Sequence, residues 1–255
     1  MKHNFFKNIK CIVFDLDGTI YFGNKLAYKV NEVIELSRSK YKNIFFATNN
    51  SAKTRQQIFE KLINLGIDVN LKEVINSGYI ITRYLKNNHY TDVYCLGTND
   101  LAKEISTINI NPFSNIPQAI VIGYDPDFNL LKLEKAINVF HKDCKIIAAN
   151  TERTYPRDNG ILMPGAGASV AAFIHTVNGS IDLIIGKPST TILEMITQDL
   201  NLVPSEILVI GDTFESDIKM AKNFGSKSIL ITNSNLNENE NFITIKSIDY
   251  LLEII

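Results

Sequence analysis

Short runs of apolar residues alternate along this chain with longer stretches in which apolar residues recur every three or four positions. The runs are rich in Ile and Val and are bounded by Gly, Asn or Asp, which is typical of buried strands. The longer stretches predict amphipathic helices, one of them carrying Leu130, Leu133, Ile137 and Phe140 on one face. The pattern predicts strands at Cys11–Phe14, Ile44–Ala47, Val93–Leu96, Ala119–Ile122, Ile146–Ala149, Leu183–Ile185, Ile207–Ile210 and Ser228–Ile231.

This alternation of strands and helices predicts an α/β fold. Strands that are apolar along nearly their whole length are buried on both faces, as in a parallel sheet covered by helices on either side. We therefore expect a doubly wound, Rossmann-like parallel sheet. With 255 residues, the chain is long enough for one large domain or two modest ones.

Composition excludes several classes of protein. The 26 Lys and Arg residues nearly cancel the 27 Asp and Glu residues, so no overall field attracts nucleic acid or an anionic membrane, and neither partner is expected. Three scattered cysteines without a Cys-x-x-Cys pair argue against disulfides and zinc, and favour a reducing, cytoplasmic location. The uncharged stretch 159–181 contains Pro164 and several glycines, so we expect a turn and a buried helix with His175 packed in it, not a membrane span.

Two carboxylates follow the first predicted strand, in the string Asp15-Leu16-Asp17-Gly18-Thr19. The carboxyl ends of the strands form the ligand crevice of an open α/β sheet, so both carboxylates are expected at its mouth. Because side chains on an extended chain repeat every second residue, Asp15 and Asp17 can point to the same side. Taken alone, the string equally fits an ordinary Asp-Gly turn.

Three further predicted strands end in polar groups. Thr48 and Asn49 follow the second strand, Lys187 follows Leu183–Ile185, and Asp212 and Asp217 follow Ile207–Ile210. Each signal alone also fits a helix cap or a solvated lysine. Together, four strands that end at one sheet edge in groups suited to phosphate predict a site for a phosphate ester.

The charges at this site indicate a metal ion. Asp15, Asp212 and Asp217 would share a small volume with a phosphate dianion, and like charges about 4 Å apart repel by roughly 4 kcal/mol per pair at an effective dielectric of about 20. One lysine cannot offset that repulsion. An all-oxygen site with carboxylates from two strands suits Mg²⁺ best, so Mg²⁺ is the expected cofactor.

The residue types also suggest roles in phosphoryl transfer. Asp15 is the expected nucleophile, which would form an aspartyl-phosphate. Asp17 would protonate the leaving alkoxide and later deprotonate the attacking water.

The remaining groups would handle charge at the transferred phosphoryl. Thr48, Asn49 and Lys187 would neutralise its oxygens in the transition state. Asp212 would complete the metal site. Asp217 would hold either Lys187 or a metal-bound water.

These motifs resemble, in order and across essentially the whole chain, the four motifs of the haloacid-dehalogenase-like phosphatase superfamily. The strings that carry the resemblance are Asp15-Leu16-Asp17-Gly18-Thr19, Thr48, Lys187 and Gly211-Asp212 with Asp217. The resemblance implies Asp15 as nucleophile and Asp17 as acid and base. It also implies that Mg²⁺ is bound by the Asp15 carboxylate, the Asp17 main-chain carbonyl and Asp212.

The long insert between the second and third motifs resembles the α/β cap of the NagD and 4-nitrophenylphosphatase-like branch. The strings concerned are Val121-Ile122-Gly123-Tyr124-Asp125, Ala149-Asn150-Thr151-Glu152, Pro156 and Pro164-Gly165-Ala166-Gly167. The expected domains are a core of residues 1–80 and 183–255 and a cap of residues 81–182. Closure of the cap predicts hinges near Gly78–Thr82 and Asp182–Gly186.

The branch also bears on substrate and assembly. It dephosphorylates small metabolites such as sugar phosphates, phosphoglycolate, pyridoxal phosphate and nucleoside monophosphates. The cap loop of the branch commonly reads Thr-Asn-x-Asp and here reads Ala-Asn-Thr-Glu, so Asn150 and Glu152 are candidates for substrate specificity while the substrate itself stays open. Cap-to-cap dimers are common in the branch, which leaves a homodimer as an open expectation.

Three alternatives use a similar set of residues. A phospho-accepting signalling module would share the carboxylates, Thr48 and Lys187, but the built-in acid and base Asp17 and the cap-sized insert oppose it. A metabolite-binding protein without catalysis would not need the full set of residues. A dehalogenase needs neither a metal nor an acid at the second aspartate, so Asp17 and Asp212 argue against it.

Overall fold

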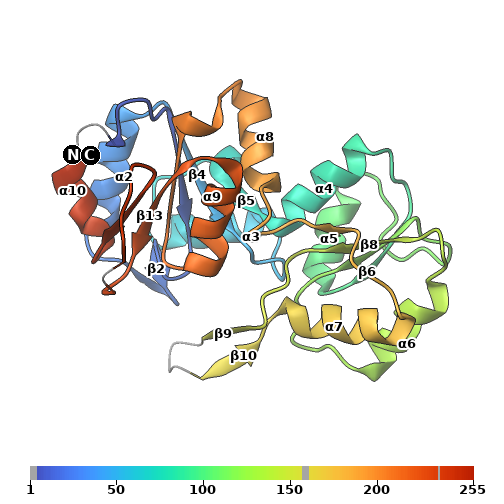
Figure 1. The fold of residues 1–255 in the computed structure, drawn as a ribbon. Coiled ribbons are helices and arrows are strands. Elements are labelled where there is room, and N and C mark those ends of the chain that lie inside the picture. Colours follow the sequence, from blue (N-terminus) through green and yellow to red (C-terminus); the bar gives the residue numbers. More distant parts are fainter. Residues whose placement is uncertain (1–4, 157–160, 235) are drawn as a thin grey trace. The chain divides into compact units, whose positions relative to one another are not determined.

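The computed structural model describes residues 5–156, 161–234 and 236–255, and the chain divides into two compact units. Unit 1 comprises Met1–Thr48, Phe59–Ile75 and Lys187–Ile255, and unit 2 comprises Asn49–Ile58 and Asn76–Gly186. Each unit is built on its own sheet with its own helices (Figure 1). The expected α/β fold with a Rossmann-like parallel sheet is confirmed.

Unit 1 contains a six-stranded sheet in the order β14-β13-β12-β1-β4-β5. The pairs from β14 to β4 are parallel, and β1, near the start of the sequence, pairs with β12, near its end. Every residue of the central strands β1 and β12 is buried. The bounds are β1 Cys11–Asp15, β4 Asn43–Thr48, β5 Val74–Asn76, β12 Ile207–Gly211, β13 Lys227–Ile231 and β14 Phe242–Ile245.

Helices and a small hairpin complete this part of the chain. Helix α9 is followed by Gly225, whose φ of +81° is the left-handed conformation that glycine adopts without strain. Helix α3 begins in unit 2 and ends in unit 1. The helices are α2 Val30–Lys40, α3 Arg55–Asn64, α8 Thr191–Leu200, α9 Lys219–Phe224 and α10 Leu251–Ile254, with the hairpin β2 Tyr21–Phe22 and β3 Lys25–Leu26 and the short turns η1 Leu71–Glu73, η2 Pro204–Glu206, η3 Phe214–Ile218 and η4 Ile248–Tyr250.

Unit 2 contains a four-stranded parallel sheet in the order β11-β8-β7-β6. Its apolar core lies between β7 and β8 and the helices α6 and α7, where Ile120, Ile146, Leu133 and Phe173 are buried together. The bounds are β6 Val93–Leu96, β7 Ala119–Ile122, β8 Lys145–Ala148, β11 Leu183–Ile184, α4 Ser77–Asn87, α5 Asn99–Ser106, α6 Leu130–Val139 and α7 Ala166–Val177, with the hairpin β9 Thr154–Pro156 and β10 Leu162–Pro164.

Two sequence predictions are wrong. The strand Leu183–Ile184 pairs with β8 in the sheet of unit 2, so Lys187 does not follow a strand of the sheet that carries Asp15. His175 is exposed on α7 and is not packed, because only one face of that helix joins the core. No helix within the described ranges has both the length and the apolar character that crossing a membrane requires.

Candidate active site

Three adjacent strands of unit 1 carry the predicted site residues at their carboxyl ends. Asp15 is the last residue of β1 and pairs in register with Ala47 of β4, so Thr48, the next residue, ends its strand beside it. On the other side, Phe14 pairs with Ile210, and Asp212 directly follows β12. Because the three strands are parallel, Asp15, Thr48 and Asp212 come together at one edge of the sheet.

Lys187 joins this edge, although it follows a strand of the other sheet. Its side chain is 3% exposed, and its ammonium group pairs with Asp15 Oδ1 and lies 2.7 Å from Asp217 Oδ1. It also donates to the main-chain oxygen of Ala47 at 3.4 Å. Lys187 therefore bridges β1, β4 and the turn after β12 at a single point.

The position of Asp217 follows from the helical turn Phe214–Ile218. This residue is 1% exposed, and its Oδ2 accepts a hydrogen bond from the Thr213 N–H at 3.2 Å. A side chain at Gly211 would overlap the Asp217 carboxylate, so the end of β12 needs a glycine there. Of the two predicted roles for Asp217, the contacts match the one in which it holds Lys187.

Negative charge exceeds positive charge at this edge. One carboxylate oxygen each from Asp15, Asp212 and Asp217 lies within 4.8 Å of the others, and Lys187 is the cation paired with two of them. Burial, opposed by Lys187 and reinforced by Asp217 and Asp212, holds the pKa of Asp15 well above its usual range. Burial and then Asp217 raise the pKa of Asp212 to about 6.

This donor set fits a hard divalent cation. All three groups are carboxylate oxygens that converge from two strand ends. Burial first, and then the neighbouring aspartates, raise the pKa values of Asp15 and Asp212, and additional positive charge would oppose both effects. Lys187 pairs with both Asp15 and Asp217, and an oxygen of the Asp212 carboxylate lies within 4.8 Å of an oxygen of each. The residues therefore match the predicted Mg²⁺ site in their chemistry.

Asp17 lies on the loop between β1 and the hairpin β2–β3, and it is exposed. Its Oδ2 accepts a hydrogen bond from the hydroxyl of Tyr21 at 3.2 Å. Burial, followed by the charges of Asp17 and Asp15, raises the pKa of Tyr21, so this phenol stays protonated and acts as the donor. At Gly18, φ is +89° and a Cβ would overlap the carboxylate of Asp212, so the glycine permits both the turn and the close approach.

Asn49, Asn150 and Glu152 form a separate cluster within unit 2. The Asn49 amide donates to Glu152 Oε1 at 2.7 Å, and the Asn150 amide donates to the Asn49 main-chain oxygen at 2.9 Å. The Glu152 N–H in turn donates to Asn150 Oδ1 at 3.1 Å. The structure thus joins the two cap-loop candidates to Asn49, which the sequence had grouped with the phosphate ligands.

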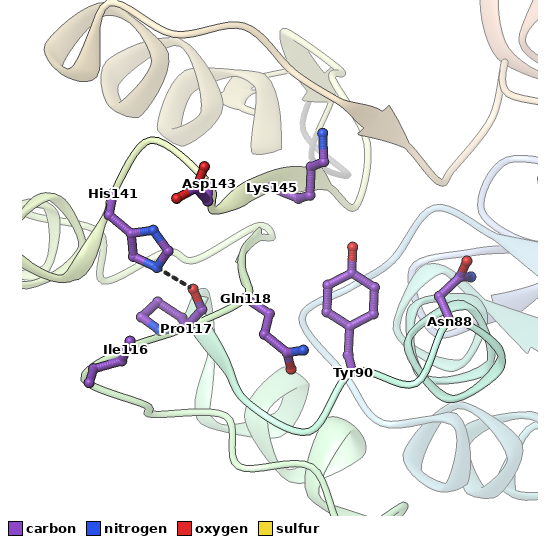
Figure 2. A pocket seen from close by; sticks show the side chains of 8 residues that line it. All are labelled: Asn88, Tyr90, Ile116, Pro117, Gln118, His141, Asp143 and Lys145. Atoms are coloured by element: carbon purple, nitrogen blue, oxygen red, sulfur yellow. Dashed lines mark hydrogen bonds between the residues drawn. The ribbon is translucent and has the colours of Figure 1, made fainter.

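A hollow of about 470 Å³ lies at the opposite, amino-terminal edge of the unit 2 sheet (Figure 2). Its polar groups bind protein partners: His141 Nε2 bonds the Pro117 oxygen at 3.0 Å, and Lys145 pairs with Asp182 at 2.9 Å. It lies where the strands β7 and β8 begin, whereas Asn150 and Glu152 follow the end of β8. This hollow therefore has no part in the cluster of Asn49, Asn150 and Glu152.

The sequence patterns of two hydrolase families match the chain, one from the first strand into the insert and the other after the insert. Residues 12–111 match the haloacid dehalogenase-like hydrolases, and residues 184–248 match the HAD-hydrolase-like family. The two matches together span more than half of the chain and contain all the predicted catalytic residues. The chain belongs to the haloacid-dehalogenase-like hydrolases.

Similar proteins of this family are phosphatases. The chain is 29% identical to the sugar-phosphatase AraL of Bacillus subtilis over 96% of its own length and 90% of that protein, and 28% identical to phosphoglycolate phosphatase 2 of Arabidopsis thaliana over 89% and 83%. Its fold matches the crystal structure of a 4-nitrophenylphosphatase from Thermotoga maritima with a TM-score of 0.89, at 27% identity and 98% coverage of both chains. The predicted membership of the 4-nitrophenylphosphatase-like branch, and with it a hydrolase of phosphomonoesters, is confirmed.

Tyr21 is a site residue of this hydrolase that the sequence analysis missed. Asp17 and Tyr21 are four residues apart, and they meet because the chain turns at Gly18. There the Gly18 N–H donates to the main-chain oxygen of Tyr21 at 2.9 Å. The signal available in the sequence was an aromatic residue with a hydroxyl group directly after Asp-Gly-Thr-Ile. Nothing in the spacing alone tells that its hydroxyl turns toward Asp17.

Proposed function

We propose that this hydrolase is a Mg²⁺-dependent phosphatase of small phosphomonoesters that works through an aspartyl-phosphate on Asp15. The observation that carries the proposal is the buried contact of Asp15 with Lys187, beside Asp212 at the carboxyl edge of the sheet. A lysine held by two carboxylates keeps its charge: burial alone would lower the pKa of Lys187, but Asp15 and Asp217 outweigh burial and raise it. Lys187 thus remains a positive charge in contact with Asp15.

In the first step, an Asp15 oxygen attacks phosphorus and the bond from phosphorus to the ester oxygen breaks. The bonding pair leaves with the ester oxygen, which takes a proton from the Asp17 carboxyl group. Lys187 and Thr48 neutralise the oxygens of the transferred group, whose charge is spread over them in the transition state. A bound Mg²⁺, held by the Asp15 and Asp212 carboxylates and the Asp17 main-chain oxygen, would supply further positive charge for those oxygens.

In the second step, water attacks the phosphorus of the aspartyl-phosphate. Asp17, now deprotonated, removes a proton from this water, and the bond between phosphorus and the Asp15 oxygen breaks. The products are inorganic phosphate and the Asp15 carboxylate, with Asp17 again protonated. The cycle therefore restores both side chains without any other reactant.

We also propose that residues 81–182 form a cap that selects the substrate. This stretch lies within unit 2, which additionally contains residues 49–58, 76–80 and 183–186. Glu152 and Asn150 are the proposed specificity residues, with the Glu152 carboxylate held by Asn49 and suited to accept hydrogen bonds from substrate hydroxyl groups. Relatives named as sugar-phosphatase and phosphoglycolate phosphatase support a small, hydroxylated or carboxylated phosphate ester as substrate class.

The proposed location rests on the cysteines, and the proposed assembly rests on the family resemblance. Cys11, Cys95 and Cys144 are all free and buried, which supports a reducing, cytoplasmic environment. A homodimer stays a prediction from the family resemblance.

The test is the variant Asp15→Asn, assayed on a panel of phosphomonoesters with Mg²⁺ and with EDTA. We expect the wild type to release phosphate only with Mg²⁺, and Asp15→Asn to lose turnover while its circular dichroism spectrum stays unchanged. The exposed Asp68→Asn is the matched control and should keep full activity. Surviving activity in Asp15→Asn would refute the covalent route, and a phosphorylated protein that persists for minutes would favour the signalling alternative.

A further inference from the structure

Asp17 has to present its carboxyl group at a fixed place for both proton transfers, yet its side chain is exposed. An exposed aspartate turns among three staggered rotamers unless a partner holds it. In this structure the partner is the Tyr21 hydroxyl, which donates to Asp17 Oδ2 at 3.2 Å. The bond leaves Oδ1 of the same carboxyl group for the proton that the reaction moves.

Tyr21 can hold Asp17 because Tyr21 is itself firmly placed. It is 3% exposed. Its main-chain N–H donates to the Leu16 main-chain oxygen at 3.2 Å, and its main-chain oxygen accepts from the Gly18 N–H at 2.9 Å. The ammonium group of Lys61, on α3, lies 3.7 Å from the centre of the Tyr21 ring. Backbone bonds and a cation on its face thus fix the ring whose hydroxyl points to Asp17.

We propose that Tyr21 is a positioning residue, which orients the carboxyl group of Asp17 for proton transfer to the leaving oxygen, with Lys61 holding its ring in place. The inference rests on the proposed phosphatase function and adds to it a residue that acts through Asp17. Tyr21 contacts neither the transferred phosphoryl nor the Asp15 nucleophile in this scheme. Its removal should therefore harm the reaction only where a proton from Asp17 is needed.

Leaving groups of graded acidity separate this role from a general structural one. An acidic leaving group, such as 4-nitrophenol, departs without a proton, whereas a weakly acidic phenol needs one. We use kcat/KM for a series of substituted phenyl phosphates, because this parameter reports the steps up to departure of the leaving group. General acid catalysis contributes roughly 10²–10⁴-fold, and loss of orientation should forfeit part of it.

For Tyr21→Phe we expect kcat/KM to fall about tenfold for the least acidic leaving groups and by less than about twofold for 4-nitrophenyl phosphate. The dependence of kcat/KM on leaving-group acidity should become steeper than in the wild type. In an Asp17→Asn background, Tyr21→Phe should change this dependence no further. Lys61→Met should steepen it in the same direction but less, because the phenol remains.

Tyr41→Phe is the matched control, since it removes another buried phenolic hydroxyl of the same unit, 8% exposed and away from the site. It should leave the dependence on leaving group unchanged. An equal loss for every ester in Tyr21→Phe, or a further effect of Tyr21→Phe in the Asp17→Asn background, would overturn the inference. Failure of the proposed function itself looks different, because Asp15→Asn would then remain active or the wild type would hydrolyse no ester of the series.

Discussion

At the scale of single residues, one lysine determines how the candidate site is held together. Lys187 is buried between Asp15 and Asp217, and removal of either carboxylate would leave its buried ammonium group with one fewer negative charge to offset it. Gly18 and Gly211 also hold the site together, because the absence of a Cβ at these positions lets Asp212 and Asp217 approach the strand ends. The site therefore depends on small residues as much as on charged ones.

A second charged pair, away from the site, allows a prediction of how stability depends on pH. Both terminal nitrogens of the Arg38 guanidinium donate to Glu73, at 2.7 and 2.8 Å, and the Asn70 N–H adds a third bond at 2.8 Å. Burial alone would raise the pKa of Glu73, but these bonds outweigh it and lower the pKa overall. Because the folded state binds the proton more weakly, the stabilisation is present above the ordinary glutamate pKa and disappears as the pH falls through the lowered value.

We therefore expect Glu73→Gln to lower the free energy of unfolding by about 1.5–3 kcal/mol at pH 7, as for hydrogen bonds to a charged group. The difference from the wild type should shrink as the pH falls below the ordinary glutamate pKa. Urea unfolding of both proteins at a series of pH values measures this difference in the free energy of unfolding. Glu32→Gln, at an exposed position on α2, the helix that carries Arg38, should change the free energy of unfolding little. A difference between Glu73→Gln and the wild type that persisted undiminished in acid would contradict the assignment.

Single residues also show which contacts of the site can be predicted from the sequence. The carboxyl-end rule correctly brought Asp15, Thr48 and Asp212 to one sheet edge, because parallel strands align their ends whatever their exact register. The contact of Tyr21 with Asp17 was not predictable in this way. It depends on the left-handed turn at Gly18 and on a hairpin whose strands have only two residues, too short for any periodic signal.

At the scale of elements, the turn after β1 can be tested by adding one carbon atom. Gly18 and Gly66 have nearly the same φ, +89° and +87°, so alanine should strain the backbone equally at both, by about 1–2 kcal/mol. They differ in their surroundings: a Cβ at Gly66 meets nothing within 4 Å, whereas one at Gly18 overlaps Asp212. Gly18→Ala must therefore displace the Asp212 carboxylate.

We expect both variants to lose similar stability in urea unfolding, but only Gly18→Ala to lose activity. A displacement of about 1 Å can reduce the rate by about 10²-fold, which sets the expected loss in kcat/KM. Gly66→Ala should keep wild-type kinetics. Equal kinetics for the two variants would mean that the approach of Asp212 to Gly18 has no part in the reaction.

The elements that were predicted and those that were missed differ in length and in partners. The predicted strands Val93–Leu96 and Ala119–Ile122 match β6 and β7 residue for residue. A short apolar run flanked by polar residues defines both ends of a buried strand. Val74–Asn76 has three residues and lies directly between the turn η1 and the helix α4, so it gives no strand pattern. Leu183–Ile184 was correctly predicted as a strand but assigned to the wrong sheet, since an apolar sequence pattern does not specify which strand it pairs with.

At the scale of the whole molecule, the two units have separate sheets and separate hydrogen-bond ladders. The candidate metal residues Asp15, Asp212 and Asp217 all belong to unit 1. A ligand that binds only the folded state stabilises the part of the protein that holds its site. Binding of Mg²⁺ should therefore protect unit 1 against opening and leave unit 2 nearly unaffected.

Two buried cysteines report on the two units separately. Cys11 lies on β1 and Cys95 on β6, and burial raises the pKa of each thiol to about 12, so neither reacts with a thiol reagent until its strand opens. In dilute urea, with the extent of labelling at each cysteine followed by peptide mass spectrometry, we expect added Mg²⁺ to slow labelling of Cys11 and to leave the rate at Cys95 unchanged. Asp212→Asn should abolish the effect at Cys11. Equal slowing at both cysteines would show that the units open as one, because protection gained at the carboxylates would then have reached the sheet of unit 2.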